Sequence, residues 1–327
     1  MTQLYGHDGA IAAFRAGLDG GKLHHAWLIS GPQGIGKALF AAKAAARVLV
    51  DAAGPSSDRP GLEVADDHRI VRLLAAGSHP DLARLERLTK DSGGELARSI
   101  SVDQVRGLQR LFGTTASLSP WRVVIVDSID DLERPAANAL LKNLEEPPPT
   151  SLFLLVSHAP ERLLPTIRSR CRVLRLSALD DDAMTAALGS ALPDAEADEI
   201  AALAASAGGS PGRALAVHGL EIGALDAAMK ALAQEGDPTN AKRSALAQSL
   251  SLKSAQPRYE AFLARAPSMI AAVARSRRGP ALADALGLWE RASGLAGSAI
   301  RLSLDPQSTT FELAGMLAAL ASKRDNV

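Results

Sequence analysis

The sequence contains a single cysteine, Cys171, among its 327 residues. One cysteine can form neither an intrachain disulfide nor a cysteine cluster that binds zinc. We expect a buried structural thiol here, with a reactive thiol as the alternative. Aromatic residues make up only 3% of the chain, while alanine and leucine are abundant, and this balance favours helices.

Net charge and long apolar runs are also missing. Lys plus Arg and Asp plus Glu number 36 each, so the overall charge indicates no polyanionic partner, although a local basic strip is compatible with this balance. Residues 1–9 lack a basic stretch that leads into an apolar one, and no segment approaches the ~18 consecutive apolar residues that a membrane helix requires. We therefore expect a cytoplasmic protein with no membrane partner.

Short apolar runs alternate with helix-forming segments up to residue 176. Four buried strands are predicted, at residues 26–30, 123–126, 152–156 and 172–176. Helices are predicted over 37–50, from Ser101, where Ser101 and Gln104 have the spacing of a capping box, and over 135–146. This order is typical of a parallel sheet flanked by helices.

The chain is longer than one hydrophobic core usually organises, so several domains are expected. After residue 177 no strand pattern remains. Alanine-leucine helices continue to the end, with glycine- and proline-containing breaks at 208–212, 236–238 and 277–280. Residues 51–67 are rich in glycine, proline, serine and acidic residues, and they are predicted to be a surface insert of unassigned role.

A glycine-rich motif, Gly31-Pro-Gln-Gly-Ile-Gly-Lys-Ala38, lies between the first predicted strand and the first predicted helix. At this position a helix N-terminus attracts phosphate, Gly31, Gly34 and Gly36 allow close backbone approach, and Lys37 would reach the outer phosphates. The next residue should supply a hydroxyl to magnesium, but Ala38 has no oxygen. The alternative is a tight strand-helix turn that matches the phosphate-loop motif by chance, with a prior of about one in ten. A once-functional nucleotide pocket is therefore preferred.

Asp127 follows the second predicted strand and is the expected carboxylate on the magnesium side of that pocket. A hydrolysing enzyme would have a glutamate directly after this aspartate to polarise water, whereas this chain has Ser128. Asp130 and Asp131 are interpreted as a solvated turn or a helix cap rather than a displaced base. Binding of ATP or ADP stays open, and hydrolysis is not expected.

The tripeptide Ser169-Arg-Cys171 precedes the last predicted strand. A surface arginine is usually solvated, whereas one offered to a neighbour's triphosphate contributes about 10³–10⁵ in rate. The tripeptide alone does not decide between these interpretations. The surrounding basic run could face DNA phosphates, but a subunit interface is preferred. Its members are Arg162, Arg168, Arg170, Arg172 and Arg175.

Histidine is the remaining candidate for metal binding. The histidines at 24, 25, 68, 79 and 158 share no helical face and have no accompanying cysteines. Capping or surface roles are favoured by roughly nine to one on the usual spacing of metal ligands. No metal site is therefore predicted.

Several blocks together resemble the bacterial clamp-loader subunits of the AAA+ family, and more closely the delta-prime family. The blocks are Leu23-His-His-Ala26, His79-Pro-Asp-Leu82, Asn138-Ala-Leu-Leu-Lys-Asn-Leu-Glu-Glu-Pro-Pro148, Pro160-Glu-Arg-Leu-Leu164 with Arg168-Ser-Arg-Cys171, and Ala207-Gly-Gly-Ser-Pro-Gly212. They span residues 23–212. The Asn-Ala-Leu-Leu-Lys and Ser-Arg-Cys blocks are highly specific, because nucleotide binding in general requires neither.

The resemblance implies an α/β fold class, with a RecA-like AAA+ parallel-sheet domain over residues 1–176. A small helical lid domain over 177–220 and an all-helical collar domain over 221–327 would follow. The resemblance also implies a rigid stator in a hetero-pentameric clamp loader of DNA polymerase III. Its partners would be gamma/tau motor subunits and a delta subunit, with the sliding clamp and primed DNA reached through the complex during DNA replication.

Residue roles follow from the same resemblance. Arg170 resembles the arginine finger that acts in trans on ATP held by an adjacent motor subunit. The chain's own degenerate ATP pocket would be lined by Gly31, Gly34, Gly36, Lys37 and Asp127.

This sequence departs from the family pattern in four ways. Ala38 and Ser128 have been described, and Gly212 stands where motor subunits have an arginine that senses nucleotide, with Arg213 one residue later. Many relatives bind zinc through four cysteines just after the first helix, and residues 51–67 contain no cysteine. We therefore expect no zinc and no required cofactor.

Three hypotheses remain: a non-hydrolysing ring subunit, a catalytically active motor subunit of the gamma/tau type, and a nucleotide-free adaptor for proteins or DNA. Ala38 and Ser128 argue against the motor, and Lys37 with its three glycines argues against the adaptor. The ring subunit is preferred. Polymerase activity would belong to the holoenzyme, because this chain shows no carboxylate cluster suited to two-metal nucleotidyl transfer.

Overall fold

The computed structural model describes residues 3–89, 96–220, 222–300 and 302–321. Two compact units divide the chain, residues 1–214 and 215–327. The predicted domain boundaries at 176/177 and 220/221 stay predictions, and residues 221, 301 and 322–327 of the third predicted domain lie outside the described residues. No helix among the described residues is long and apolar enough to cross a membrane.

The first unit is built on a five-stranded sheet in the order β2-β3-β4-β1-β5, and all of its strand pairs are parallel. The strands are β1 (Ala26–Ser30), β2 (Leu82–Glu86), β3 (Arg122–Asp127), β4 (Ser151–Ser157) and β5 (Arg172–Arg175). Ser30 is paired with Ser157, and Asp127 with Val156. The carboxyl ends of β1, β3 and β4 therefore meet at one edge of the sheet.

All four strands predicted from the sequence are present, but β2 was not predicted. Its sequence, Leu-Ala-Arg-Leu-Glu, mixes charged and apolar residues, and only Leu85 is buried. This composition is possible because β2 pairs with β3 alone and forms an edge of the sheet. An apolar-run criterion detects strands buried on both faces and misses such an edge strand.

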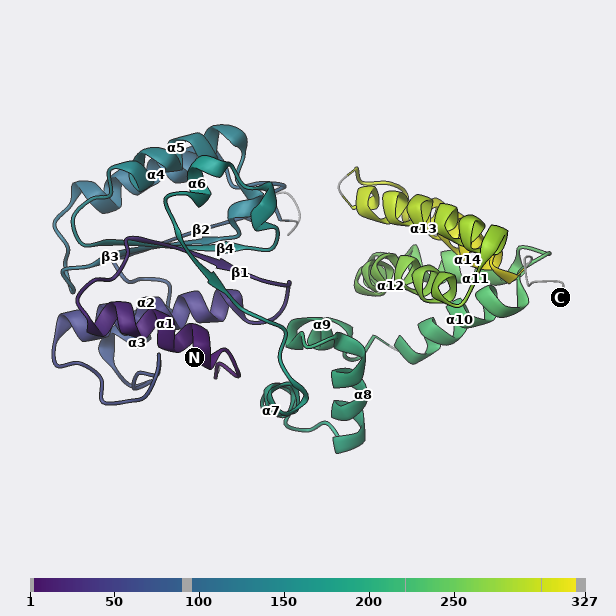
Figure 1. The fold of residues 1–327 in the computed structure, drawn as a ribbon, viewed down its shortest axis with the longest axis horizontal. Coiled ribbons are helices and arrows are strands. Elements are labelled where there is room, and N and C mark those ends of the chain that lie inside the picture. Colours follow the sequence, from purple (N-terminus) through teal and green to yellow (C-terminus); the bar gives the residue numbers. More distant parts are fainter. Residues whose placement is uncertain (1–2, 90–95, 221, 301, 322–327) are drawn as a thin grey trace. The chain divides into compact units, whose positions relative to one another are not determined.

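Helices cover both faces of the sheet (Figure 1). One face carries α1 (Asp8–Asp19), α2 (Lys37–Ala53) and α3 (Arg69–Ala75), and the other carries α4 (Val102–Gly113), α5 (Arg134–Glu145) and α6 (Pro165–Arg168). Alternate strand residues enter two separate cores. Trp27 and Ile29 point into the α1–α3 core, while Ala26 and Leu28 enter the α4–α6 core.

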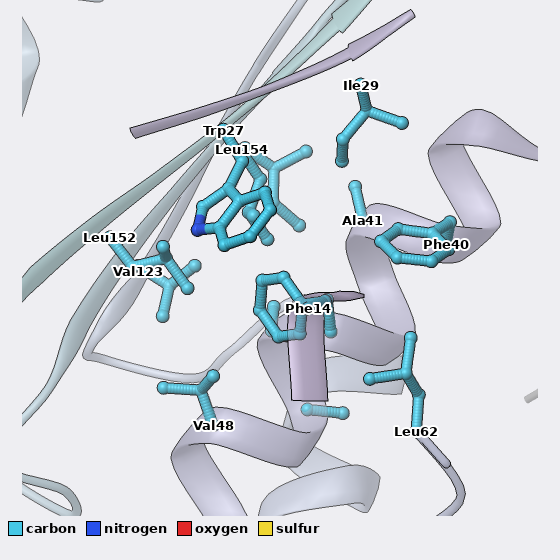
Figure 2. Close-up of a cluster of buried hydrophobic side chains, with 14 of the residues drawn as sticks. Phe14, Trp27, Ile29, Phe40, Ala41, Val48, Leu62, Val123, Leu152 and Leu154 are labelled. Atoms are coloured by element: carbon cyan, nitrogen blue, oxygen red, sulfur yellow. The ribbon is translucent and has the colours of Figure 1, made fainter. Parts of the chain in front are cut away.

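Three aromatic side chains pack together in the α1–α3 core (Figure 2). The ring of Phe14 lies between those of Trp27 and Phe40, with centroid distances of 5.2 and 6.2 Å. All three side chains are fully buried. Three of the chain's aromatic residues thus lie where α1 and α2 pack against the sheet, and this packing positions the helix that begins at Lys37.

The predicted helix boundaries agree with the structure to within a few residues. Ser101 is the N-cap of α4, and its reciprocal hydrogen bonds with Gln104 form the predicted capping box. The α5 helix begins and ends one residue before the predicted range of 135–146. The predicted 37–50 helix continues to Ala53.

Only helices follow β5 among the described residues, as predicted. The first unit ends with α7 (Asp181–Ala191), α8 (Ala197–Ala207) and the beginning of α9 (Pro211–Val217), which enclose a small core that includes Met184 and Leu188. The second unit contains α10 (Ile222–Glu235), α11 (Ala241–Leu250), α12 (Gln256–Arg275), α13 (Gly279–Ala299) and α14 (Pro306–Ala318) around its own core. The predicted α/β fold class, with a parallel sheet followed by helical regions, is confirmed.

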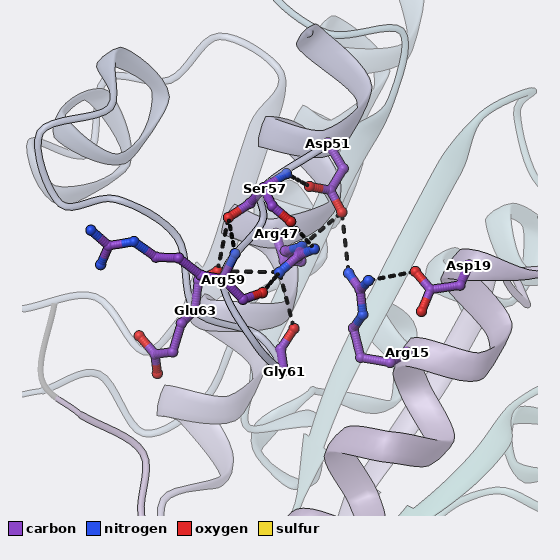
Figure 3. Close-up of polar contacts among 8 residues, drawn as sticks. All are labelled: Arg15, Asp19, Arg47, Asp51, Ser57, Arg59, Gly61 and Glu63. Atoms are coloured by element: carbon purple, nitrogen blue, oxygen red, sulfur yellow. Dashed lines mark hydrogen bonds and ion pairs between the residues drawn. The ribbon is translucent and has the colours of Figure 1, made fainter. Parts of the chain in front are cut away.

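One buried arginine organises the insert that the sequence analysis left unassigned (Figure 3). Arg47 of α2 donates hydrogen bonds to the backbone carbonyls of Ser57, Arg59, Gly61 and Glu63, at 2.8–3.2 Å. Its Nε donates to Asp51 Oδ2 at 2.7 Å. Because the residue is only 2% exposed, these acceptors replace water around the whole guanidinium.

Further ion pairs hold the two ends of the insert to α2. Asp51 accepts a hydrogen bond from the Ser57 amide and another from Arg15 of α1. Lys43 Nζ contacts both carboxylate oxygens of Glu63 at 2.8 and 2.9 Å. Residues 54–64 are therefore attached by side chains of α2 rather than by regular secondary structure.

Replacing Arg47 by methionine is expected to detach the insert, because four carbonyls and Asp51 would lose their donor. We expect the free energy of unfolding to fall by about 3 kcal/mol and limited proteolysis to begin within residues 54–64. Chemical denaturation and mass mapping of the first cleavage measure both effects. The exposed Arg59→Met variant is the control, and equal behaviour of the two variants would contradict the assigned role of Arg47.

Candidate functional site

The loop between β1 and α2 has the backbone geometry of a phosphate-binding loop. Gly31, Gly34 and Gly36 have φ values of 148°, 80° and 100°, which residues with a Cβ rarely adopt. A Cβ on Gly31 would also lie 2.2 Å from the carbonyl oxygen of Leu176. The predicted glycines are therefore required by the turn itself, whether or not phosphate binds.

Lys37 is directed into its own loop. The Nζ donates to the carbonyl oxygens of Gly31 and Pro32 at 2.7 and 2.5 Å, and the residue is only 3% exposed. Burial lowers the pKa of Lys37 from 10.5 to about 8, although the carboxylates of Asp130 and Asp127 oppose the shift. The ammonium group that would bind an outer phosphate is already satisfied by backbone.

The segment that precedes and begins α9 packs directly on the same loop. Ser210 Oγ donates to the carbonyl of Gln33 at 2.9 Å, and the amide of Gly212 donates to the carbonyl of Gly34 at 2.8 Å. A Cβ on Gly212 would lie 2.7 Å from Gly34 Cα. Glycine at 212 is thus needed for this approach, and an arginine there would prevent it.

The N-terminal segment contacts the loop as well. His7 Nε2 lies 2.8 Å from the carbonyl oxygen of Ile35. Leu4 Cδ1 would be 3.5 Å from a Cβ on Gly36. Residues 4–7 and 210–212 therefore meet the same short loop from two segments of the chain.

Asp127 is at the carboxyl end of β3, as predicted, but it is paired with a cation of the chain itself. Arg84 Nη2 donates to Asp127 Oδ2 at 2.9 Å, and Arg84 Nε lies 2.8 Å from Glu86 Oε2. Arg84 belongs to β2, the strand that was not predicted. The carboxylate that would face magnesium is thus bonded to a guanidinium, and the side chain of Ala38 has no oxygen that could bind the metal.

Asp130, predicted to be part of a solvated turn or a cap, lies at the candidate site. Its carboxylate accepts hydrogen bonds from Ser157 Oγ and from the amides of His158 and Ala159, at 2.6–3.3 Å. It thereby joins the ends of β3 and β4 beside Lys37. Burial and the nearby Lys37 lower the pKa of His158. The only sequence feature that pointed to Asp130 was its position three residues after Asp127.

Ser128 and Asp131 complete this edge. Ser128 is buried, and its hydroxyl donates to Asp131 Oδ2 at 3.0 Å. Arg87 Nε lies 3.5 Å from the same oxygen of Asp131. The residue that would be the water-polarising glutamate in a hydrolase is therefore a buried hydroxyl already bonded within its own turn.

Arg170 lies near the amino ends of β1 and β5, whereas these groups lie at the carboxyl ends of the strands. It precedes β5 by two residues, and β5 pairs in parallel with β1 from Arg172 opposite Trp27. The structure thus brings Lys37, Asp127 and the loop glycines together and separates Arg170 from them. Its guanidinium is partly exposed and contacts Glu145 Oε1 at 2.8 Å.

The other residues of the basic run have different environments. The guanidinium of Arg172 lies over the Trp27 ring, 4.8 Å from its centroid. Arg162, Arg168 and Arg175 are exposed. Burial raises the pKa of the Cys171 thiol to about 12, which fits the expected inert structural cysteine.

No group of three or more potential metal ligands occurs within the part of the chain that the structure describes. His68 caps α3 by accepting from the Ile70 amide, and His79 accepts from the amide of Asp81. In the insert, Arg47 occupies the centre and presents only donors, so the residues there do not fit zinc.

Comparison with known proteins finds a matching family model and several similar proteins. A family model described as "DNA polymerase III, delta subunit" matches residues 6–180. A protein of Pseudomonas aeruginosa named "DNA polymerase III subunit delta'" is 41% identical over 196 residues, which cover 60% of this chain and 56% of that protein. The protein of the same name from Escherichia coli is 35% identical over 207 residues, 63% of this chain and 57% of its own length.

A second type of relative also matches. The "DNA polymerase III subunit gamma/tau" of Mycobacterium tuberculosis is 35% identical over 170 residues, which cover 52% of this chain and 27% of that protein. This chain spans little more than half the length of the two relatives named delta'. The similarity is thus to part of each relative.

The lowered pKa of Lys37 predicts a pH dependence of stability. Between pH 8 and 10.5 the unfolded chain still binds the proton that the folded chain has lost, so the free energy of unfolding rises with pH. Relative to Lys37→Met, the native chain should gain about 2–3 kcal/mol over this window. Urea denaturation at several pH values measures the difference, with Lys22→Met, at an exposed lysine, as control. Parallel curves for the native chain and Lys37→Met would contradict the burial of a titrating ammonium.

Proposed function

The chain belongs to the DNA polymerase III delta-subunit family, and on that premise we propose that it is a non-hydrolysing, stator-like subunit of the clamp loader. In this proposal Arg170 is an arginine finger that acts on ATP bound by the adjacent gamma/tau motor subunit. A delta subunit would be the other kind of partner in the hetero-pentamer. The assembly would load the sliding clamp onto primed DNA during replication in the cytoplasm.

One observation carries the non-hydrolysing part of the proposal: the groups that would bind nucleotide and metal are engaged by the chain itself. Lys37 is bonded to carbonyls of its loop, and Asp127 to Arg84. Hydrolysis would require each of these contacts to be replaced, and Ala38 and Ser128 would still lack the magnesium ligand and the base.

Support for the finger comes from how Arg170 is presented. It stands in the short turn between α6 and β5, while Ile167 and Leu174 on either side of it are buried. The turn is therefore anchored in two cores on either side of Arg170, whose side chain is 35% exposed. Such a preorganised cation suits the charge that develops on a transferred phosphoryl group.

A catalytically active motor of the gamma/tau type is the second candidate, because a gamma/tau relative is 35% identical over 170 residues. The pocket chemistry described above argues against it. We also propose that polymerase activity belongs to the holoenzyme and that this chain requires no cofactor and no zinc.

The finger is tested by Arg170→Ala in a clamp loader reconstituted with the motor and delta subunits of the same organism. ATP turnover at the motor site next to this chain should fall by about 10³-fold, because the developing charge loses its guanidinium. DNA-stimulated phosphate release measures turnover, and size-exclusion chromatography confirms assembly. Arg168→Ala, at an exposed arginine two residues earlier, is the control. Full turnover in an assembled Arg170→Ala loader would refute the finger.

The two candidate functions differ for the isolated chain. We expect no ATP turnover above background, since no oxygen of residue 38 holds magnesium and Ser128 cannot polarise water. Phosphate release by the purified chain at millimolar ATP and Mg²⁺ measures this, with an isolated motor subunit as positive control. Turnover comparable to that of the motor would favour the second candidate.

A further inference from the structure

The guanidinium of Arg170 is held by three partners on one side of its own turn. Nη1 donates to the carbonyl of Thr166 at 2.9 Å and to Ser169 Oγ at 3.3 Å. Nη2 contacts Glu145 Oε1 at 2.8 Å. Among the described residues, no partner is recorded for Nε. The three contacts therefore fix the plane of the guanidinium and leave Nε–H to an incoming acceptor.

Glu145 comes from a different element, the last residue of α5. Its place is determined by tertiary contacts: His25 Nε2, just before β1, lies 3.2 Å from the carbonyl oxygen of Leu144. The side chain of Leu144 is buried in the core that also contains Ile167. The end of α5 and the turn that carries Arg170 are thus parts of one packed platform.

Glu145 stands against the local preference of a helix. A negative charge in the last turn interacts unfavourably with the C-terminal end of the helix dipole. The pair with Arg170 adds little to stability, since the side chains of Glu145 and Arg170 are 47% and 35% exposed. Residues that break a local rule without a gain in stability are concentrated at functional positions.

We propose that Glu145 is the positioning residue for Arg170. Its carboxylate restricts the rotamers of the arginine and directs the free edge of the guanidinium outward before a neighbour's triphosphate arrives. This inference rests on the proposed finger role and adds a second residue to it. The carboxylate touches no substrate, so its effect passes entirely through the arginine.

The test uses Glu145→Gln in the reconstituted clamp loader. Loss of the charge frees the guanidinium, and we expect kcat for DNA-stimulated ATP turnover at the adjacent site to fall about tenfold or more. The KM for ATP should not change, because the motor subunit holds the nucleotide. Glu145→Asp should restore part of the rate. Glu146→Gln removes the same charge one residue later and should behave as the native chain.

A double-mutant cycle separates positioning from a general structural effect. If Glu145 acts through Arg170, Glu145→Gln adds nothing to Arg170→Ala, and the unfolding midpoint of the isolated Glu145→Gln chain equals that of the native chain. Additive losses, or equal rates for Glu145→Gln and Glu146→Gln while Arg170→Ala is impaired, would overturn the positioning role and leave the finger intact. An unimpaired Arg170→Ala loader would overturn both.

Discussion

Parallel pairing of β1 with β4 and β5 determines where each candidate functional group lies. The phosphate-loop glycines, Asp127 and Asp130 follow the carboxyl ends of strands, so the register of the sheet gathers them at one edge. Arg170 precedes β5 and therefore lies near the amino ends of β1 and β5. A chain with this arrangement cannot direct Arg170 at its own loop between β1 and α2.

Closure of the pocket is achieved by ordinary hydrogen bonds rather than by loss of the loop. The strained glycine conformations are kept, because the turn from β1 to α2 needs them for packing. Lys37 Nζ donates to carbonyls of the loop, and the carbonyl of Gly34 accepts a hydrogen bond from the amide of Gly212. Glycine at position 212 allows the α9 segment to approach this loop closely, which a larger side chain there would prevent.

The insert after α2 shows a second use of a buried cation. Arg47 gathers four backbone carbonyls and Asp51, so one side chain gives residues 54–64 a fixed shape without regular hydrogen-bonded structure. A guanidinium can do this because its donors lie in one plane and point in several directions. The arrangement uses no cysteine and offers no ligand set to a metal.

The sequence by itself determined the features that depend on atom types and local periodicity. In any fold, Ala38 lacks a side-chain oxygen and Ser128 lacks a carboxylate. The apolar runs of β1, β3 and β4 could be predicted as strands because both of their faces are buried. Tertiary structure alone decided the pairings between distant residues: Arg84 with Asp127, Gly34 with Gly212, Arg47 with the insert, and Glu145 with Arg170. Strand β2 and the contacts of Asp130 were not predicted, because the partners of their charged residues lie far away in the sequence. A charged side chain has no preferred partner in the sequence, because its contacts are set by which backbone segments the packed cores bring within about 3 Å.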